Sequence, residues 1–494
     1  MNNALSCAVK RNVYHDPLHT ANYQTKRFYE LLFPETAERL QRHPPFQEHL
    51  LSIILVSMRH KLIPMSILAL MVGYTGLHAQ ESAPFRAPFP SSLSVAHTWN
   101  RSLTKKAGQM VGEQLAREGV KEVALPDLTV VTTATTGNIL NTYGQSPYLT
   151  AETGVEMVKG LQNKNQLKAY LTFDAKEKNA PYVRPWQRVS DEAHAAGIAS
   201  PAQVKATAAF GATGNNVSDE FFKTIALQVA HESITLLKNA GNILPLDTTW
   251  AKRITVCGDA QLVADMLPVL KAGLPCKVDA GSPAAADLIL VFEDDNIDQA
   301  RMEKLLLTGK PVALVLLNSR PVALGKANEA AAIIEAWHPG QQGMQAITNV
   351  LAGTYNPGGK LAVAFPDYAF GHGLSYTDFR YSDLRIEPAS IGTDGSVTVR
   401  FNVTNTGTRA GAEVVQVYLV DEQSTVPLQS PKLEACKRTN INPGQTKEIK
   451  FTIRHRNMVL LNRAGEWTVE PGFFTVRVGN SSDDIRLQGR FEVK

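Results

Sequence analysis

The stretch Ala331–Pro366 constrains the fold of this chain more than any other, because its apolar residues change their period within it. Ala332–Trp337 is a mostly apolar run of strand length, and Pro339-Gly340 breaks it. The apolar residues that follow recur at helical spacing, namely Met344, Ile347 and Leu351. Gly353 then stands where a glycine ends a helix. The stretch therefore predicts a strand, a turn and a helix in succession.

A second strand is expected directly after this helix. Asn356–Gly359 has the composition of a turn, and Leu361–Phe365 has the apolar composition of a strand. A strand–helix–strand unit is the building block of a mostly parallel sheet covered by helices. Such sheets bind ligands beyond the carboxyl ends of their strands. We therefore expect Trp337 and His338 to face a cleft.

Regular elements are also expected upstream of this unit. Amphipathic spacing predicts helices over Arg101–Gly119, over the second part of 141–161 and from Ser218 to Lys238. A strand is expected at Val123–Val131. Three further apolar runs predict strands buried on both faces, at Ile254–Cys257, Leu288–Phe292 and Val312–Leu317.

The C-terminal part alternates apolar and polar residues with a period of two. The alternating apolar positions include Val397, Val399, Phe401, Val403, Val415, Val417, Leu419, Ile449, Phe451, Ile453, Phe474, Val476 and Val478. Pro- and Gly-containing turns separate these runs. The pattern predicts about seven short strands in an immunoglobulin-like β-sandwich.

The N-terminus has the pattern of an export signal. Residues 58–79 combine a basic start, an apolar run and a final small residue, which predicts a signal peptide and a periplasmic or extracellular (secreted) protein. Residues 1–57 would then be an extension upstream of the true start at Met58. The alternative is a single-pass anchor, but the apolar run is shorter than the ~20 residues of a span. We expect no stable membrane span after signal cleavage.

Composition excludes several classes of protein. The chain has 494 residues, 44% of them hydrophobic, and a net charge of +4 without a basic stripe. Nucleic acid is therefore not an expected partner. The four cysteines lack metal-ligand spacing; Cys257 and Cys276 would either pair in an oxidising compartment or remain buried thiols. No zinc, P-loop or serine-hydrolase motif occurs, so we expect no cofactor and no metal.

Several phrases resemble those of glycoside hydrolase family 3. Two phrases within Ala331–Pro366, W-x-P-G-Q-x-G and N-P-x-G-K-L, resemble the α/β-sandwich domain of that family. The phrase A-x-E-S-I-T-L-L-K-N within 230–239 resembles the same domain. T-Y-G-x-x-P-Y-L within 142–149 resembles its N-terminal (β/α)8 barrel. F-G-x-G-L-S-Y-T within 370–377 resembles its link to a fibronectin-III-like domain. The resemblance covers about four-fifths of the chain.

The resemblance implies an α/β plus all-β chain with the following domains. Residues 80–217 would be a partial (β/α) barrel-like region, 218–368 the α/β sandwich, 369–384 a linker and 385–494 the fibronectin-III-like domain. A complete barrel needs ~200–250 residues. Residues 80–217 are too few, so the resemblance implies an incomplete barrel remnant.

The resemblance also implies a retaining mechanism, which needs two carboxyl groups about 5 Å apart. The family's nucleophile is an Asp in an S-D-W-type phrase, which this sequence lacks; Ser190-Asp191 is nearest but is typical of a solvated helix start. The acid/base Glu follows a strand of the α/β sandwich, which makes Glu293 the candidate. The loop that should carry it towards the barrel is short, and helix capping is the alternative role.

Sugar-binding candidates come from the same resemblance. Asp127 and Asp174 could contact a sugar hydroxyl, although solvated acids at strand ends are the alternative. Trp337 could stack on a sugar ring or fill a seam between domains. His338 could line the cleft or pack as an ordinary histidine.

Two hypotheses about function remain. The first is a β-glucosidase-type hydrolase of O-glycosidic bonds, active in carbohydrate metabolism on β-linked oligosaccharides or glycosides. The second is a non-catalytic carbohydrate-binding or structural relative. Family membership does not by itself establish activity, and the missing carboxylates favour weakened or lost catalysis.

Overall fold

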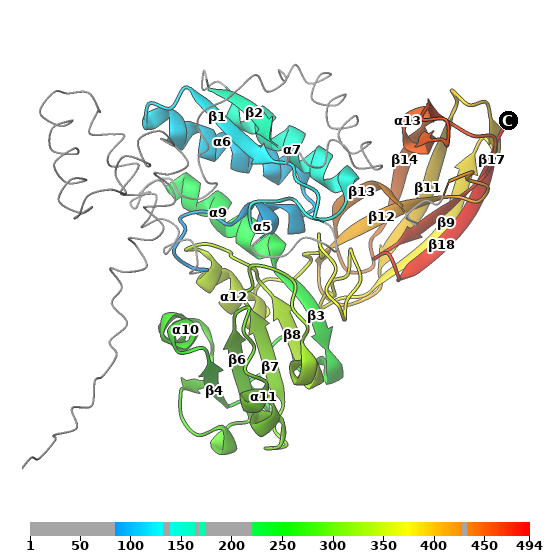
Figure 1. Cartoon of the computed structure of the whole chain (residues 1–494). Coiled ribbons are helices and arrows are strands. Elements are labelled where there is room, and N and C mark those ends of the chain that lie inside the picture. The colour runs from blue at the N-terminus through cyan, green and yellow to red at the C-terminus, as the bar shows by residue number, and fades with distance from the viewer. Residues whose placement is uncertain (1–83, 132–138, 164–166, 173–219, 427–431) are drawn as a thin grey trace, which may run out of the picture. The chain divides into compact units, whose positions relative to one another are not determined.

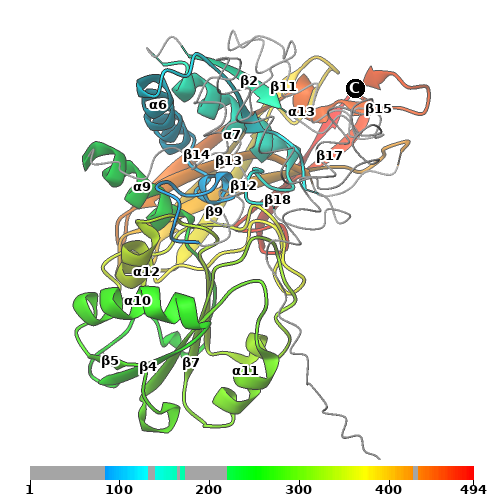
Figure 2. The ribbon, with the colours of Figure 1, turned by 60° about the vertical axis from the view of Figure 1, so that its left-hand side comes forward.

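The computed structural model describes residues 84–131, 139–163, 167–172, 220–426 and 432–494 (Figure 1, Figure 2). The predicted extension, the predicted signal peptide, Asp174 and Ser190-Asp191 lie outside these residues. Within them, no helix has both the length and the apolar character that a membrane crossing requires.

A six-stranded sheet forms the α/β domain. Its strand order is β3-β8-β7-β6-β4-β5, in which β3 is antiparallel to β8 and all other neighbours are parallel. The strands are β3 Thr235–Asn239, β4 Arg253–Gly258, β5 Lys277–Asp279, β6 Leu288–Glu293, β7 Val312–Leu316 and β8 Ala332–Glu335. This is the mostly parallel sheet that the sequence predicts.

Helices cover both faces of this sheet, as Figure 2 shows for α10 and α11. Helices α9 (Glu220–Ser233), α10 (Ala260–Gly273) and α12 (Gly343–Leu351) contribute to one buried core cluster. Helix α11 (Gln299–Leu306) contributes to the cluster on the opposite face. Strands β6, β7 and β8 are buried at every position, which explains why they are apolar apart from the glutamates that end β6 and β8.

Two predicted elements of this domain are wrong. The helix predicted to continue to Lys238 ends at Ser233, because the buried residues that follow form the edge strand β3. Leu361–Phe365 is not a strand. Its backbone bonds to neighbouring loops instead: Leu361 N–H donates to the His372 carbonyl at 2.8 Å, and the Ala362 carbonyl accepts from Gln145 N–H at 3.0 Å.

The described N-terminal part contains two parallel strands and three helices. These are α5 Ser92–His97, α6 Arg101–Arg117, β1 Glu122–Asp127, α7 Pro147–Leu161 and β2 Lys168–Thr172. Helices α6 and α7 cross closely at two glycines, since a Cβ on Gly108 would lie 2.3 Å from the Met157 carbonyl oxygen. The order of elements is consistent with a piece of a (β/α) barrel.

The C-terminal domain is a β-sandwich of the fibronectin-III-like type that the sequence predicts. One sheet has the order β10-β18-β17-β12-β13 and the other β14-β11-β9. Their bounds are β9 Phe379–Glu387, β10 Ser390–Ile391, β11 Ser396–Asn405, β12 Gly411–Asp421, β13 Lys432–Ile441, β14 Thr446–Arg454, β17 Gly472–Gly479 and β18 Ile485–Val493. A short helix α13 (His455–Met458) and the hairpin β15 (Leu460–Leu461) and β16 (Trp467–Thr468) complete the domain. The inward-facing residues form one core between the sheets.

The core of the N-terminal part is shared with the other domains. Its apolar cluster joins residues of α6 and α7 to Phe222 and Ile225 of α9. It also includes Val414, Tyr418 and Leu433 of the sandwich strands β12 and β13. The N-terminal part therefore buries its apolar face by packing against a sheet that lies more than 240 residues later in the chain.

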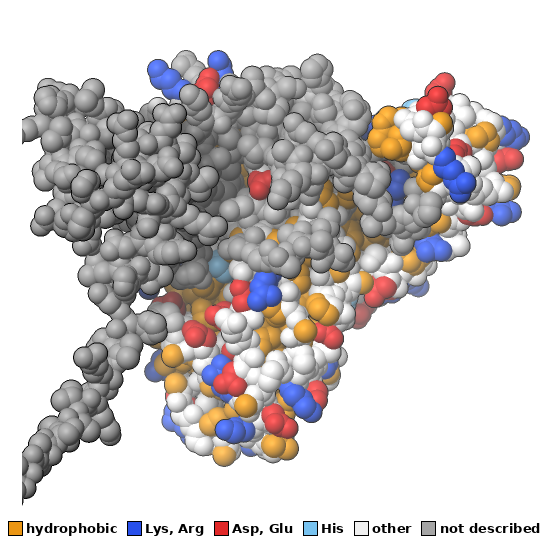
Figure 3. Space-filling model, viewed as in Figure 1, with side chains coloured by type: hydrophobic (Ala, Val, Ile, Leu, Met, Phe, Trp, Pro, Cys, Tyr) orange, Lys and Arg blue, Asp and Glu red, His pale blue; other side chains and the backbone are white. Residues whose placement is uncertain are grey.

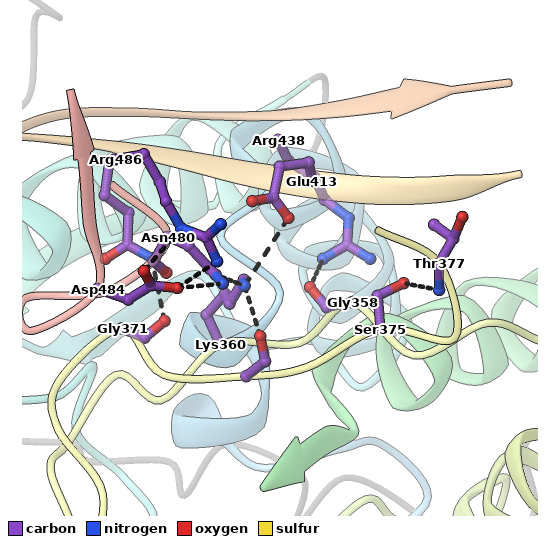
Figure 4. A network of polar contacts seen from close by, with 12 residues as sticks. Gly358, Lys360, Gly371, Ser375, Thr377, Glu413, Arg438, Asn480, Asp484 and Arg486 are labelled. Atoms are coloured by element: carbon purple, nitrogen blue, oxygen red, sulfur yellow. Dashed lines mark hydrogen bonds and ion pairs between the residues drawn. The ribbon is translucent and has the colours of Figure 1, made fainter. Parts of the chain in front are cut away.

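Residues 356–377, here called the junction segment, connect all three parts (Figure 4). The buried Lys360 donates from Nζ to the Gly373 carbonyl at 2.6 Å and to Asn480 Oδ1, and it lies 3.8 Å from a carboxylate oxygen of Glu413. Burial lowers the pKa of Lys360, and the Glu413 charge opposes this. A buried cation thus links the segment to the sandwich.

Arg438 of β13 makes the second connection. Its Nη1 donates to the Gly358 carbonyl at 2.7 Å and to the Thr98 carbonyl at 3.1 Å. Its Nε lies 3.1 Å from Oε2 of Glu232 in α9, which also accepts from Asn100 Nδ2 at 2.8 Å. One guanidinium group of the sandwich therefore bonds to the junction segment, the N-terminal part and α9.

Candidate functional site

The carboxyl ends of β6, β7 and β8 lie at one edge of the α/β sheet, here called the carboxyl edge. Glu293 ends β6, Asn318-Ser319 follows β7, and the residues Glu335–His338 end and follow β8. The edge therefore collects three of the four predicted site residues, because neighbouring parallel strands end at the same edge of the sheet.

Glu293 is held by an ion pair rather than open to a ligand. Its side chain is 1% exposed, and Arg301 Nη2 of α11 lies 2.7 Å from each carboxylate oxygen. Burial raises the pKa of Glu293, and the Arg301 guanidinium acts against that shift. A general acid must offer a proton to the leaving oxygen. A carboxylate with both oxygens bound to one guanidinium is poorly placed to do so.

Glu335 is a buried acid that sequence reasoning missed. Its side chain has no exposed surface, and Oε1 accepts the Trp337 backbone N–H at 2.6 Å. Oε2 accepts from Asn318 Nδ2 at 3.3 Å. Burial raises the pKa of Glu335 well above 4.5, and the nearby Asp295 charge adds to the shift. The only signal in the sequence is an acid within an otherwise apolar strand.

Trp337 lies inside the core. It has no exposed surface, and its ring packs 5.6 Å from the Phe365 ring and 4.8 Å from the His97 ring, measured between centroids. Its backbone φ of 55° is strained for an aromatic residue, and the short bond to Glu335 helps to fix it. Neither face of the indole is open to a sugar ring. The packing of Trp337 therefore fits the alternative that it fills a seam between domains.

His338 and Asp295 complete the carboxyl edge. His338 is 9% exposed, and its carbonyl accepts from Ser91 N–H at 3.0 Å and from Ser94 Oγ at 3.1 Å. Burial lowers the pKa of His338 to about 4, against the pull of Asp295. Asp295 accepts the Ser319 N–H at 2.8 Å and also its hydroxyl. The edge is therefore covered by α5 and its flanking residues. The His338 imidazole is neutral at neutral pH.

Asp127 lies elsewhere, at the carboxyl end of β1 in the N-terminal sheet. Its Oδ1 accepts both the backbone N–H of Thr129 at 2.9 Å and its hydroxyl at 2.8 Å. This local turn leaves the other carboxylate oxygen as an acceptor.

The described residues hold no group of three His, Cys, Asp or Glu side chains that could bind a metal ion. Cys257 and Cys276 are free thiols in the structure, not a disulfide. Burial raises the pKa of Cys257 to about 11. In Figure 3, acidic and basic side chains are interspersed over the visible face of the α/β domain.

Family models match three parts of the chain. A glycosyl hydrolase family 3 N-terminal domain matches residues 52–178, a glycosyl hydrolase family 3 C-terminal domain matches 290–400, and a fibronectin type III-like domain matches 413–482. The N-terminal match begins upstream of the predicted signal peptide. The chain belongs to glycoside hydrolase family 3.

Curated relatives are β-xylosidases and β-glucosidases. The chain is 29% identical to a β-xylosidase of Formosa agariphila over 56% of this chain and 50% of that protein. It is 30% identical to a periplasmic β-glucosidase of Salmonella typhimurium over 54% of this chain and 44% of that protein. The chain therefore spans about half the length of the curated relatives that it matches.

Solved structures show the same fold at lower identity. The β-glucosidase 3B of Thermotoga neapolitana, in complex with α-D-glucose, superposes with a TM-score of 0.69 at 18% identity, covering 83% of this chain and 89% of that chain. A β-glucosidase of Listeria innocua in complex with glucose gives a TM-score of 0.68 at 17% identity, covering 83% and 86%. These similarities establish the architecture.

Proposed function

We propose that this chain binds β-linked saccharides in the manner of a β-glucosidase-type family 3 protein, with weakened or lost hydrolysis of the glycosidic bond. The bidentate ion pair of Glu293 with Arg301 is the observation that carries the proposal. The candidate acid is buried, and both of its oxygens are occupied by a neighbouring cation. Such a group stabilises the strand end better than it protonates a leaving group.

The proposed saccharide rests on family membership. Relatives that match this chain are named β-glucosidases and β-xylosidases. The β-glucosidase of Listeria innocua has been solved with glucose and, as a mutant, with laminaribiose. A β-linked oligosaccharide or glycoside is therefore the ligand class to test. A purely structural role is the second candidate, and the burial of Trp337 favours it.

The four predicted site residues divide by exposure. Asp127 is partly exposed and supports the role of a partner for a sugar hydroxyl. His338 and Trp337 are buried, so we propose that they shape the carboxyl edge beneath any ligand. Glu293 keeps the role of acid only if the bond to Arg301 opens.

We further propose a periplasmic or secreted location, with residues 58–79 as the signal peptide. The pattern of these residues supports this, together with the periplasmic β-glucosidase among the relatives. Amino-terminal sequencing of protein purified from the medium or periplasm tests the cleavage site, and an intact Met58 would contradict it.

The test of function is turnover of an aryl β-glucoside by protein that begins at Ala79, alongside calorimetric titration with glucose. Measurable binding without hydrolysis supports the proposal, and turnover typical of the family overturns it. The variant Arg301→Gln releases Glu293 and should raise any residual rate, with Arg301→Gln/Glu293→Gln as the matched control. If the rate of hydrolysis is the same in the native chain and in both variants, Glu293 is not the acid.

A further inference from the structure

The outer face of the three-stranded sheet β14-β11-β9 carries an unusual arrangement of charge. Along β11 the odd-numbered residues from Val397 to Val403 are buried between the sheets. The even-numbered residues from Thr398 to Thr404 therefore point outwards and are partly exposed. Polar residues on this outer face are expected, but rows of like charge are not.

The strand register places three cations side by side. Arg400 in the middle strand pairs with Lys450 of β14 on one side and with Arg385 of β9 on the other. Directly opposed residues have Cβ atoms about 5 Å apart, and like charges at that distance destabilise a sheet. These three residues, here called the cationic row, therefore carry a cost that the fold itself does not require.

Three acids on the same face, Asp383, Glu387 and Glu448, offset only part of the positive charge. Arg400 Nη1 lies 3.6 Å from a carboxylate oxygen of Glu448. The Asp383 carboxylate accepts from Ser382 Oγ at 2.8 Å and from Asn402 Nδ2 at 2.9 Å. These two hydrogen bonds lower the pKa of Asp383 most, and the charges of Arg385 and Arg380 lower it further.

The two outer members of the row remain available. Arg385 and Lys450 are exposed, and neither has a side-chain hydrogen bond or close ion pair in the part of the chain that the structure describes. The register adds Arg380 and Arg454 to the outer face, with Glu387 as the remaining acid. The face therefore has an excess of positive charge centred on the row.

We propose that the cationic row binds an acidic polysaccharide, a polymer that carries one uronate carboxylate per sugar. Guanidinium groups bind carboxylates with paired hydrogen bonds, and a row of cations suits a ligand with regularly repeated anions. A saccharide is the partner of choice because the chain belongs to a family that acts on glycosides.

This surface is separate from the carboxyl edge. Strands β9, β11 and β14 contribute no residue to the edge formed by β6, β7 and β8. The proposal therefore rests on family membership and not on catalysis. Loss of polymer binding should leave turnover of an aryl β-glucoside and binding of glucose unchanged.

The test is electrophoresis of the full chain through gels that contain polygalacturonate, with hydroxyethylcellulose as the neutral polymer. The triple variant Arg385→Gln/Arg400→Gln/Lys450→Gln removes the row. The control Lys252→Gln/Lys271→Gln/Lys277→Gln removes the same charge from exposed positions of the α/β domain. We expect polygalacturonate to retard the native chain and the control, and the row variant to bind about tenfold more weakly.

The proposal is overturned if polygalacturonate does not retard the native chain, or if both triple variants bind it equally weakly. It is also overturned if hydroxyethylcellulose retards the native chain as much as polygalacturonate does. A fourth contrary outcome is that dextran sulfate, duplex DNA or anionic vesicles bind as tightly as polygalacturonate at matched charge. Thermal melting checks that the row variant folds. If it does not fold, the single variant Arg400→Thr places a strand-favouring residue at the centre and must show the same selective loss in smaller measure.

Discussion

The α/β sheet and the N-terminal part solve the same packing problem in different ways. The sheet buries both faces under its own helices, and its two core clusters come mostly from residues 230–365. The described residues of the N-terminal part form two strands, which cannot enclose a core alone. It shares one cluster with α9 and with Val414, Tyr418 and Leu433 of the sandwich.

The difference shows that completeness of a sheet decides where its stability comes from. A sheet with helices on both faces supplies its own apolar contacts. A shorter piece must take them from a neighbour, and here that neighbour is the sandwich. The junction segment and Arg438 add polar contacts at the same place.

Separate expression should produce the largest difference. We expect a fragment of residues 80–217 to remain insoluble or to melt without a cooperative transition, because nine of the 30 buried residues in its core cluster belong to other parts of the chain. A fragment of residues 218–494 keeps the cores of the α/β sheet and the sandwich and should unfold cooperatively. Calorimetry measures both. A monodisperse, cooperatively melting fragment 80–217 would show that this part is self-sufficient.

Removal of the buried cation at the junction should come next. Lys360→Met leaves Glu413 buried without its partner, which costs about 3–5 kcal/mol in the free energy of unfolding. The double variant Lys360→Met/Glu413→Leu should recover much of that loss. Lys326, in an exposed pair with Glu329, is the control, and Lys326→Met should leave the Tm unchanged. Equal effects at both lysines would argue against a stabilising junction.

The carboxyl edge predicts a pH effect within the self-contained sheet. The raised pKa of Glu335 means that the folded chain retains a proton that the unfolded chain releases above about 4.5. Stability from this group is therefore present at low pH and is lost as the pH rises towards the folded pKa. In the variant Glu335→Gln the side chain does not titrate, so this loss of stability with rising pH does not occur.

The measurement is denaturant unfolding of both proteins across the pH range. The advantage of Glu335→Gln should grow with pH above about 4.5, by at most about 1.4 kcal/mol per pH unit. His97 and His338, whose pKa values burial lowers to about 3 and about 4, act in the opposite direction but equally in both proteins. A constant difference would show that Glu335 is ionised in the folded state.

The smallest effect is expected on the outer face of the sandwich, away from the junction. Arg400→Thr relieves two like-charge contacts and should stabilise the chain by about 0.2–1 kcal/mol. The matched control is Thr398→Arg on the same strand, which places an arginine opposite Glu387 and Thr452 instead of opposite two cations. A loss of stability in Arg400→Thr would mean that Glu448 outweighs the two cations.

Local pattern predicted the architecture wherever burial follows the sequence period. Buried runs such as Leu288–Phe292 are apolar throughout and β11 alternates strictly, so the sequence predicts both strands correctly. The apolar residues of Ile234–Leu237 continue the spacing of α9, so the sequence predicts a helix where the structure has β3. Leu361–Phe365 is apolar because it is buried against loops of the N-terminal part and of the α/β domain, and the period alone cannot distinguish such a segment from a strand.

The candidate site was less predictable because its chemistry depends on distant partners. The sequence places Glu293 at a strand end but does not show that Arg301 reaches both of its oxygens. Trp337 was expected at the edge of the sheet and is there, yet α5 and Phe365 bury it completely. The cationic row depends on the register of three strands, and register between strands is set by the whole sandwich.

Arg438 has a consequence for engineering this protein. Its guanidinium bonds to carbonyl groups of two other domains and to Glu232, so the sandwich is not an interchangeable accessory. A chimera that replaces residues 385–494 with the corresponding module of a relative would need an arginine in the same place and a compatible loop at Gly358. Module exchange without both would leave Glu232 and the facing backbone carbonyls to seek other donors.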